Sequence, residues 1–167
     1  MYIVITKPEF WEGEAEAITR KLEAGLERLH IRKPGSTEAQ REALLRAIPA
    51  CYHDRIVIGD KLMGYMANDP ERRVVGHACH SIDELREWQG KLCTGEVRVQ
   101  YLSLSPIFDS ISKQGYKAAF SHEELLAAKA EGLINEHVMA LGGICSHNIE
   151  EALRYGFGGV MVLGDAW

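Results

Sequence analysis

Several features that mark special classes of protein are scarce in this chain of 167 residues. No apolar run approaches the roughly 20 residues that span a bilayer, and the first residues lack the basic and apolar regions of a secretory signal. The net charge is −5, so the chain lacks the basic surface that nucleic-acid phosphates require. These absences predict a cytoplasmic protein that binds neither membranes nor nucleic acids.

Cysteine and proline are also sparse and carry no motif. The 4 cysteines have no CxxC spacing, which favours reduced thiols over a disulfide framework. Only 5 prolines are present, while 46% of the residues are hydrophobic and 26% are charged, as in an ordinary globular protein. We therefore expect one domain over residues 1–167.

Strand-like and helix-like segments alternate along the whole chain. Short apolar segments predict strands at residues 2–6, 29–33, 55–58, 62–67, 73–79, 97–104, 137–141 and 159–163. Helical spacing or a helix cap predicts helices at residues 14–28, 37–48, 81–89, 121–130 and 146–155. Ser81 with Glu84, and Ser121 with Glu124, have the spacing of a capping box.

This alternation predicts a parallel sheet covered by helices, and eight strands indicate an α/β fold of the (β/α)8 TIM barrel type. Such barrels typically need about 250 residues. Between residues 58 and 62 there is no room for a crossover helix, and none follows the last strand. We expect a barrel shortened around strands three to five and lacking the last helix, with breaks near residues 59–61 and after residue 69.

The segment HIRKPG, residues 30–35, carries a polar pair on a strand. His30 and Arg32 are two apart and share a face, which in a barrel looks into the interior. A guanidinium near a strand end suits a phosphate. The alternative is that Arg32 pairs with a core carboxylate while His30 fills space.

Two further segments follow strands and offer anion donors. The first, SLSPIFDSISK at residues 103–113, ends in Ser110, Ser112 and Lys113, although a serine-rich loop is more often only solvated. The second combines Gly142 and Gly143 with the glycine-flanked strand that ends at Gly164. Barrels bind phosphate with backbone N–H groups after strands seven and eight; the alternative is that these glycines serve tight turns.

The cluster GHACH at residues 76–80 has the residue types of a metal site without its geometry. On a strand, His77 and Cys79 share one face and His80 points to the other, and no fourth ligand has suitable spacing. A structural or substrate-lining role is the better interpretation.

Together the segments YIVIT, HIRKPG, GHACHSIDEL, YLSLSPIFDSISKQG, ALGGI and GFGGVMVLG resemble the thiamine phosphate synthase and TenI family. The resemblance implies a (β/α) barrel whose synthase members join a hydroxymethylpyrimidine diphosphate to a thiazole phosphate and release pyrophosphate. It implies that phosphorylated pyrimidine and thiazole molecules are the partners. It assigns catalytic roles to Arg32, Lys113 and His30, and substrate binding to Lys33, Ser110, Gly142, Gly143, Val162 and Leu163.

The chain departs from the family pattern where the family holds Mg²⁺. Synthases place two magnesium-binding aspartates after strands three and four, where this sequence is short; Asp60 and Asp69 are the nearest candidates. Pro106 occupies the position of the TenI histidine, although His30 matches another TenI residue. A synthase, a TenI-type tautomerase and a non-catalytic phosphate-binding protein therefore remain alternatives, and a homo-oligomer is compatible with each.

Overall fold

The computed structural model describes residues 1–109 and 117–167. Its strands are β1 (Tyr2–Ile5), β2 (Arg28–Arg32), β3 (Ile56–Gly59), β4 (Tyr65–Met66), β5 (Gly76–Cys79), β6 (Tyr101–Leu104), β7 (Val138–Leu141) and β8 (Gly159–Val162). Its α-helices are α1 (Glu14–Glu23), α2 (Glu38–Arg46), α3 (Ile82–Thr94), α4 (His122–Ala130) and α5 (Ile149–Arg154), with 3₁₀ turns η1 (Ala50–Arg55) and η2 (Gly164–Ala166). No helix in this described part is both long and apolar enough to cross a membrane.

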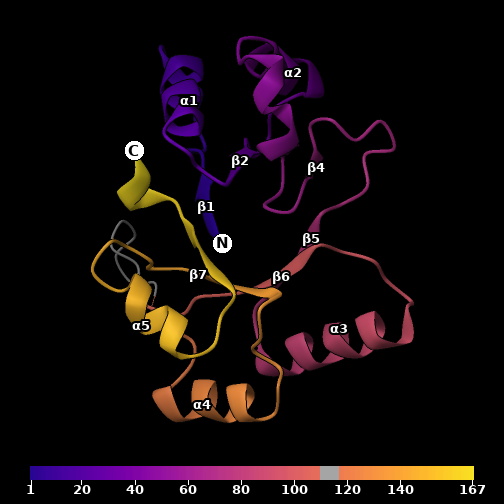
Figure 1. The fold of residues 1–167 in the computed structure, drawn as a ribbon, viewed down its shortest axis with the longest axis vertical. Helices are drawn as coiled ribbons and strands as arrows, with labels where there is room; N and C mark the ends of the chain where they lie inside the picture. Colours follow the sequence, from indigo (N-terminus) through magenta and orange to yellow (C-terminus); the bar gives the residue numbers. More distant parts are fainter. Residues whose placement is uncertain (110–116) are drawn as a thin grey trace.

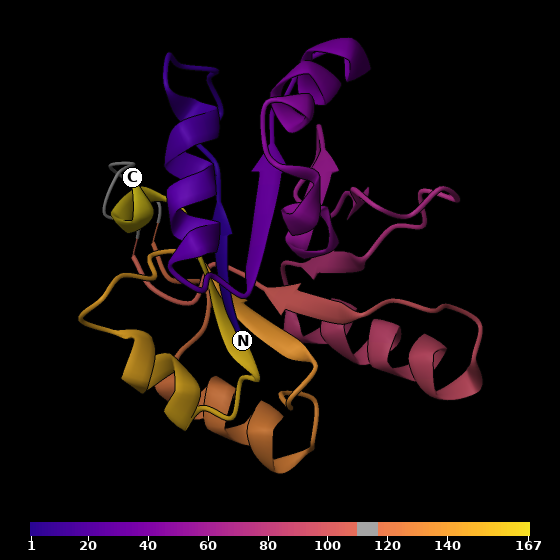
Figure 2. The ribbon, with the colours of Figure 1, turned by 45° about the horizontal axis from the view of Figure 1, so that its top comes forward.

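The strands form a single sheet in the order β4-β3-β2-β1-β8-β7-β6-β5. Its strand pairs are parallel apart from β3 and β4, which are antiparallel. The two sheet edges meet, because Tyr65 forms a bridge with Val74 and the Val75 N–H donates to the Gly64 carbonyl at 2.9 Å. The sheet is therefore curled on itself, with the helices on its outside (Figures 1 and 2).

The predicted alternation of strands and helices is confirmed, but the set of eight parallel strands is wrong in one place. The segment predicted as a strand at residues 62–67 contributes only Tyr65–Met66, which turn back along β3. No helix lies between β3 and β5, both of which are fully described. The fold is thus a mixed α/β, curled eight-stranded sheet.

The apolar side chains form one cluster inside the curled sheet and two outside it. The inner cluster comprises Ile3, Ile5, Val57, Met66, Val75, Tyr101, Met139 and Met161. One outer cluster packs α1 and α2 against β1 to β3, and the other packs α3, α4 and α5 against β5 to β8. In Figure 1, α1 and α2 lie above the strands and α3, α4 and α5 lie below them, so the two groups cover different parts of the outer face.

Local sequence signals account for the helix ends. Ser121 and Glu124 form the predicted capping box at α4. Ser81 caps α3, but the Glu84 carboxylate accepts instead from the His80 N–H at 2.8 Å. Helix α1 ends at Glu23, earlier than predicted, because Gly25 adopts a φ of 95° that other residues rarely reach.

The connection between β3 and β4 is a short hairpin, and the breaks expected near residues 59–61 and after residue 69 stay a prediction. Residues 60–64 form the hairpin loop, and hydrogen bonds join the Ala67 N–H to the Ile56 carbonyl (2.8 Å) and the Arg72 N–H to the Asp69 carbonyl (3.1 Å). The hairpin needs glycine for space, since a side chain on Gly64 would overlap the Ile58 carbonyl. The missing crossover helix is replaced by this hairpin.

Gly64→Ala should therefore destabilise the protein strongly. We expect a loss of roughly 2 kcal/mol or more in the free energy of unfolding, because the backbone must shift to admit the extra carbon. Gly90→Ala is the matched control: this residue lies in α3 with no atom near its added carbon, so the variant should gain about 0.5–1 kcal/mol from helix propensity. Urea unfolding measures both, and equal stability of the two variants would contradict the proposed packing.

Candidate active site at the strand ends

A cavity of about 540 Å³ opens at the carboxyl ends of the strands. Its wall combines residues from the ends of β1, β2, β5 and β7, the segment after β8, and the β3–β4 connection: Ile5, Arg32, Pro34, Gly35, Asp60, Lys61, Leu62, Ala78, His80, Leu141 and Leu163. The carboxyl ends of barrel strands are where such folds place their ligands. This cavity is therefore the candidate active site.

Arg32 is the last residue of β2 and is partly exposed on the cavity wall. The Thr6 hydroxyl fixes its backbone, accepting from the Arg32 N–H at 3.1 Å and donating to the Arg32 carbonyl at 3.3 Å. Its guanidinium forms no hydrogen bond or ion pair with another described residue. The alternative that Arg32 pairs with a core carboxylate thus finds no support within residues 1–109 and 117–167.

Three further polar residues line the wall: Asp60, a metal candidate by sequence; His80, from the GHACH segment expected to be structural or substrate-lining; and Lys61, which no sequence pattern indicated. Asp60 and Lys61 are exposed on the β3–β4 connection. His80 follows β5, and its Nδ1 lies 3.2 Å from the Ser105 hydroxyl.

His30 shares the inner face of β2 with Arg32, as predicted, but lies beneath the cavity rather than on its wall. Its side chain is 1% exposed. Nδ1 donates to the Leu62 carbonyl at 2.8 Å, so in the neutral ring Nε2 accepts from the Tyr101 hydroxyl. Burial lowers the pKa of His30 to about 4, which keeps the ring uncharged near neutral pH. The expected ligand-facing position of His30 is therefore corrected to a buried one.

Lys33 also lies away from the cavity. Its ammonium is 0% exposed and donates to the Lys7 carbonyl (2.9 Å), the Glu9 carbonyl (2.6 Å) and the Glu14 carboxylate (2.6 Å). An ammonium has three protons, so no donor is left for a substrate. Lys33 anchors the β1–α1 connection, and its expected substrate contact is corrected.

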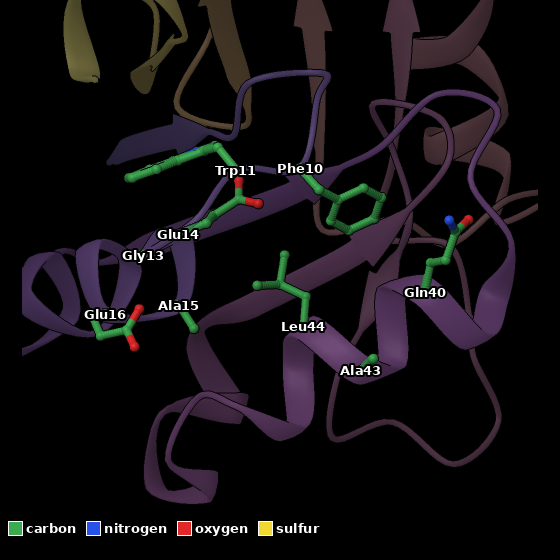
Figure 3. Close-up of a pocket in the computed structure, with 9 residues that line it drawn as sticks. All are labelled: Phe10, Trp11, Gly13, Glu14, Ala15, Glu16, Gln40, Ala43 and Leu44. Atoms are coloured by element: carbon green, nitrogen blue, oxygen red, sulfur yellow. The ribbon is translucent and has the colours of Figure 1, made fainter.

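The Lys33 partner Glu14 belongs to a separate hollow on the outside of the sheet. Figure 3 shows the Glu14 carboxylate between Trp11 and Phe10, with Leu44 of α2 on the opposite wall. This hollow lies between α1 and α2 and is lined by mostly apolar side chains. This hollow is thus separate from the cavity at the strand ends.

The two glycines after β7 pack closely against the loop that follows β6, and the N–H group of one of them has no described acceptor. Gly142 and Gly143 have φ values of 91° and 66°, and a side chain on Gly143 would lie 2.6 Å from the Phe108 carbonyl. Within the described residues, the N–H groups of Gly143 and Leu163 meet no hydrogen-bond acceptor. Val162 is buried in the outer core, so only its backbone can face a ligand. Ser110 and Lys113 lie outside the described residues.

The acidic residues do not fit a magnesium site. Asp69 pairs with Arg73 at 3.1 Å, which lowers the pKa of its carboxyl, and it borders a different hollow from Asp60. Asp60 is the single carboxylate on the described cavity wall. Over residues 1–109 and 117–167, no three His, Cys, Asp or Glu side chains gather as metal ligands. In the GHACH segment, His77 instead bonds Glu84 at 2.7 Å and stacks on Trp88.

Comparison with known proteins identifies the family of the chain. The model of the thiamine monophosphate synthase family matches residues 65–165, more than half of the chain. A solved thiamine phosphate pyrophosphorylase from Bacteroides thetaiotaomicron is 35% identical with a TM-score of 0.78, over 98% of this chain and 83% of that one. The chain belongs to the thiamine phosphate synthase/TenI family. Its role accordingly lies in thiamine biosynthesis.

A more distant structure shares the fold. The thiamine phosphate pyrophosphorylase from Pyrococcus furiosus is 18% identical with a TM-score of 0.70, over 99% of this chain and 89% of that one. No curated protein matches the chain. Within this thiamine phosphate synthase/TenI chain, Gly143 and Leu163 lie inside the residues that match the family model, whereas Arg32 and Lys61 precede them.

The buried His30 predicts a specific loss of stability in acid. Its pKa is about 4 in the folded protein and about 6.5 when unfolded. The unfolded chain binds the proton first, so stability is full above pH 6.5 and falls as the pH drops toward 4. Between pH 8 and 4.5 the loss from this group is about 2–3 kcal/mol.

His30→Gln removes the titrating ring and should show a smaller loss over the same pH interval. Urea unfolding at the two pH values measures it, with His137→Gln as the control because His137 is 69% exposed. If the His30 variant lost as much unfolding free energy between pH 8 and 4.5 as the wild type and the His137 variant, a buried neutral His30 ring would be ruled out.

Proposed function

We propose that this chain is a thiamine phosphate synthase, which joins a hydroxymethylpyrimidine diphosphate to a thiazole phosphate and releases pyrophosphate. The observation that supports this most is Arg32, a partly exposed guanidinium on the wall of the cavity that has no acidic partner among the described residues. Such a group is suited to an anionic ligand. The 35% identical structure bears the name of this activity.

The reaction breaks the bond between the pyrimidine methylene carbon and the diphosphate oxygen, and the electron pair leaves with pyrophosphate. The methylene carbon becomes cationic, and the thiazole nitrogen attacks it with its lone pair to form the C–N bond. No proton is transferred, so a general base is not required. The site must instead supply positive charge beside the leaving group, where negative charge develops in the transition state.

We assign the pyrophosphate end to Arg32 and Lys113, with the Ser110 hydroxyl as a further donor. A guanidinium and an ammonium can both donate charged hydrogen bonds to phosphate oxygens. Arg32 has the advantage of a backbone fixed by Thr6. The origin of the side chain is therefore fixed beside the cavity, so that its guanidinium can reach a ligand there without a movement of the backbone.

We assign the thiazole phosphate to the backbone of Gly142–Gly143 and Val162–Leu163. The Gly143 and Leu163 N–H groups meet no acceptor in the described part of the chain, and both residues are partly exposed, so each N–H group is available to an anion. The Ser146 N–H donates to the Asp165 carboxylate at 2.8 Å, which ties the two phosphate-binding segments together. Backbone donors of this kind hold an anion on a protein of negative net charge.

His30 and Lys33 are positioning residues in this proposal. His30 supports the β3–β4 connection through Leu62, and Lys33 supports the β1–α1 connection through Glu14. The β3–β4 connection lines the cavity, and the β1–α1 connection follows Ile5, which also lines it. We route no step through Mg²⁺, because the described acidic residues do not form a site for it.

A non-catalytic phosphate-binding protein is the second candidate. The lone Asp60 favours it, since the family's synthases carry two aspartates for the metal. The unpaired Arg32 counts against it, because a protein that binds only thiazole phosphate has no need of charge at the pyrophosphate end. The TenI-type tautomerase is less favoured, because Pro106 stands in place of the histidine that performs that reaction.

One assay separates these candidates. Purified protein is incubated with both substrates, with magnesium and separately with EDTA, and the products are separated by chromatography. The synthase proposal predicts thiamine phosphate and pyrophosphate in equal amounts. Binding of thiazole phosphate without any turnover would reject the synthase and support the binding protein.

Lys113→Ala should abolish most of this activity. Losing one preorganised charge at the leaving group commonly lowers kcat by about 100-fold or more. Thiazole phosphate should bind as before, because its phosphate is held by backbone donors. Lys117→Ala, four positions along the same segment, is the control and should keep wild-type turnover. Near-normal kcat in Lys113→Ala would remove the leaving-group role of this lysine.

A further inference from the structure

We infer that Lys61 binds the pyrophosphate group together with Arg32, and that these two cations take the place of the magnesium site. This rests on the proposed synthase function. It assigns a substrate-binding role to a residue that no sequence pattern indicated, on a connection specific to the shortened region of this chain.

Lys61 is held at the cavity by a rigid support. It lies in the hairpin between β3 and β4, whose ends approach so closely that a side chain on Gly59 would lie 2.9 Å from the Gly64 Cα. The next residue, Leu62, accepts the hydrogen bond from the buried His30. The backbone on both sides of Lys61 is thus fixed, while its side chain is exposed on the cavity wall.

Lys61 and Arg32 lie at neighbouring strand ends. Arg32 of β2 is in register with Gly59 of β3, and Lys61 follows two residues later. Adjacent strands are about 4.8 Å apart, so side chains from these two ends can reach both phosphate groups of one diphosphate. Neither cation has a hydrogen-bond or ion-pair partner within the described residues.

The charge of the wall favours an anion over a divalent cation. Asp60 is its one described carboxylate, against Arg32 and Lys61. Magnesium is bound in proteins through carboxylates as well as phosphate oxygens. With two cations and one carboxylate on the wall, the charge of a diphosphate is neutralised by Arg32 and Lys61 rather than by a bound magnesium ion.

Isothermal titration calorimetry with pyrophosphate tests this inference. We expect the wild type to bind pyrophosphate in EDTA, with no gain in affinity when magnesium is added. Lys61→Ala should weaken binding in EDTA by about 10- to 100-fold, the range for one charged hydrogen bond. Lys61→Arg should keep most of the affinity. Lys91→Ala is the control with no expected change, because Lys91 pairs with Glu87 on α3.

The Asp60→Asn variant distinguishes pyrophosphate binding by cations from pyrophosphate binding through a metal. In our account the carboxylate only repels the ligand, so its neutralisation should tighten pyrophosphate binding. If Asp60 holds a metal, the same variant should weaken binding in magnesium. Pyrophosphate binding that needs magnesium, or that is equal in the Lys61→Ala and wild-type proteins, would overturn the inference. Thiamine phosphate formation measured on the same wild-type sample shows separately whether the proposed function stands.

Discussion

The hydrogen bond from His30 to the Leu62 carbonyl joins the interior of the sheet to the rim of the cavity. It matters because the chain returns from β3 to β4 through a short hairpin where a parallel barrel has a crossover helix. A hairpin that short brings its backbone over the interior, and a buried carbonyl there requires a donor. The neutral His30 ring supplies one and in turn accepts from Tyr101. Asp60 and Lys61 lie between the end of β3 and this hydrogen-bonded Leu62, at the strand ends.

Charge is distributed differently on the two sides of the sheet. On the outside, Lys33 is enclosed with Glu14, and removing one partner of such a pair commonly costs about 3–5 kcal/mol. On the inside, Arg32 and Lys61 have no described partner and remain available to a ligand. Adjacent residues of one strand end, Arg32 and Lys33, thus serve opposite purposes because successive side chains point to opposite faces.

The sequence predicted the elements that depend on local patterns and missed what distant segments determine. The Ser121–Glu124 capping box and the inward face shared by His30 and Arg32 follow from spacing alone. The antiparallel β4 could not be predicted, since two residues carry no periodicity. The family resemblance made Lys33 a substrate contact, and its pairing with Glu14 could not be predicted because Glu14 lies in another element. Lys61 belongs to no motif; its position depends on the hairpin and on His30.

The central claim is that cations rather than a metal hold the diphosphate at these strand ends. A crystal of the protein soaked with pyrophosphate in magnesium-free solution tests it most directly. We predict pyrophosphate with its two phosphate groups within hydrogen-bond distance of the Arg32 guanidinium and the Lys61 ammonium. Pyrophosphate that enters the crystal only with magnesium and is held through a metal ion on Asp60 would contradict the account.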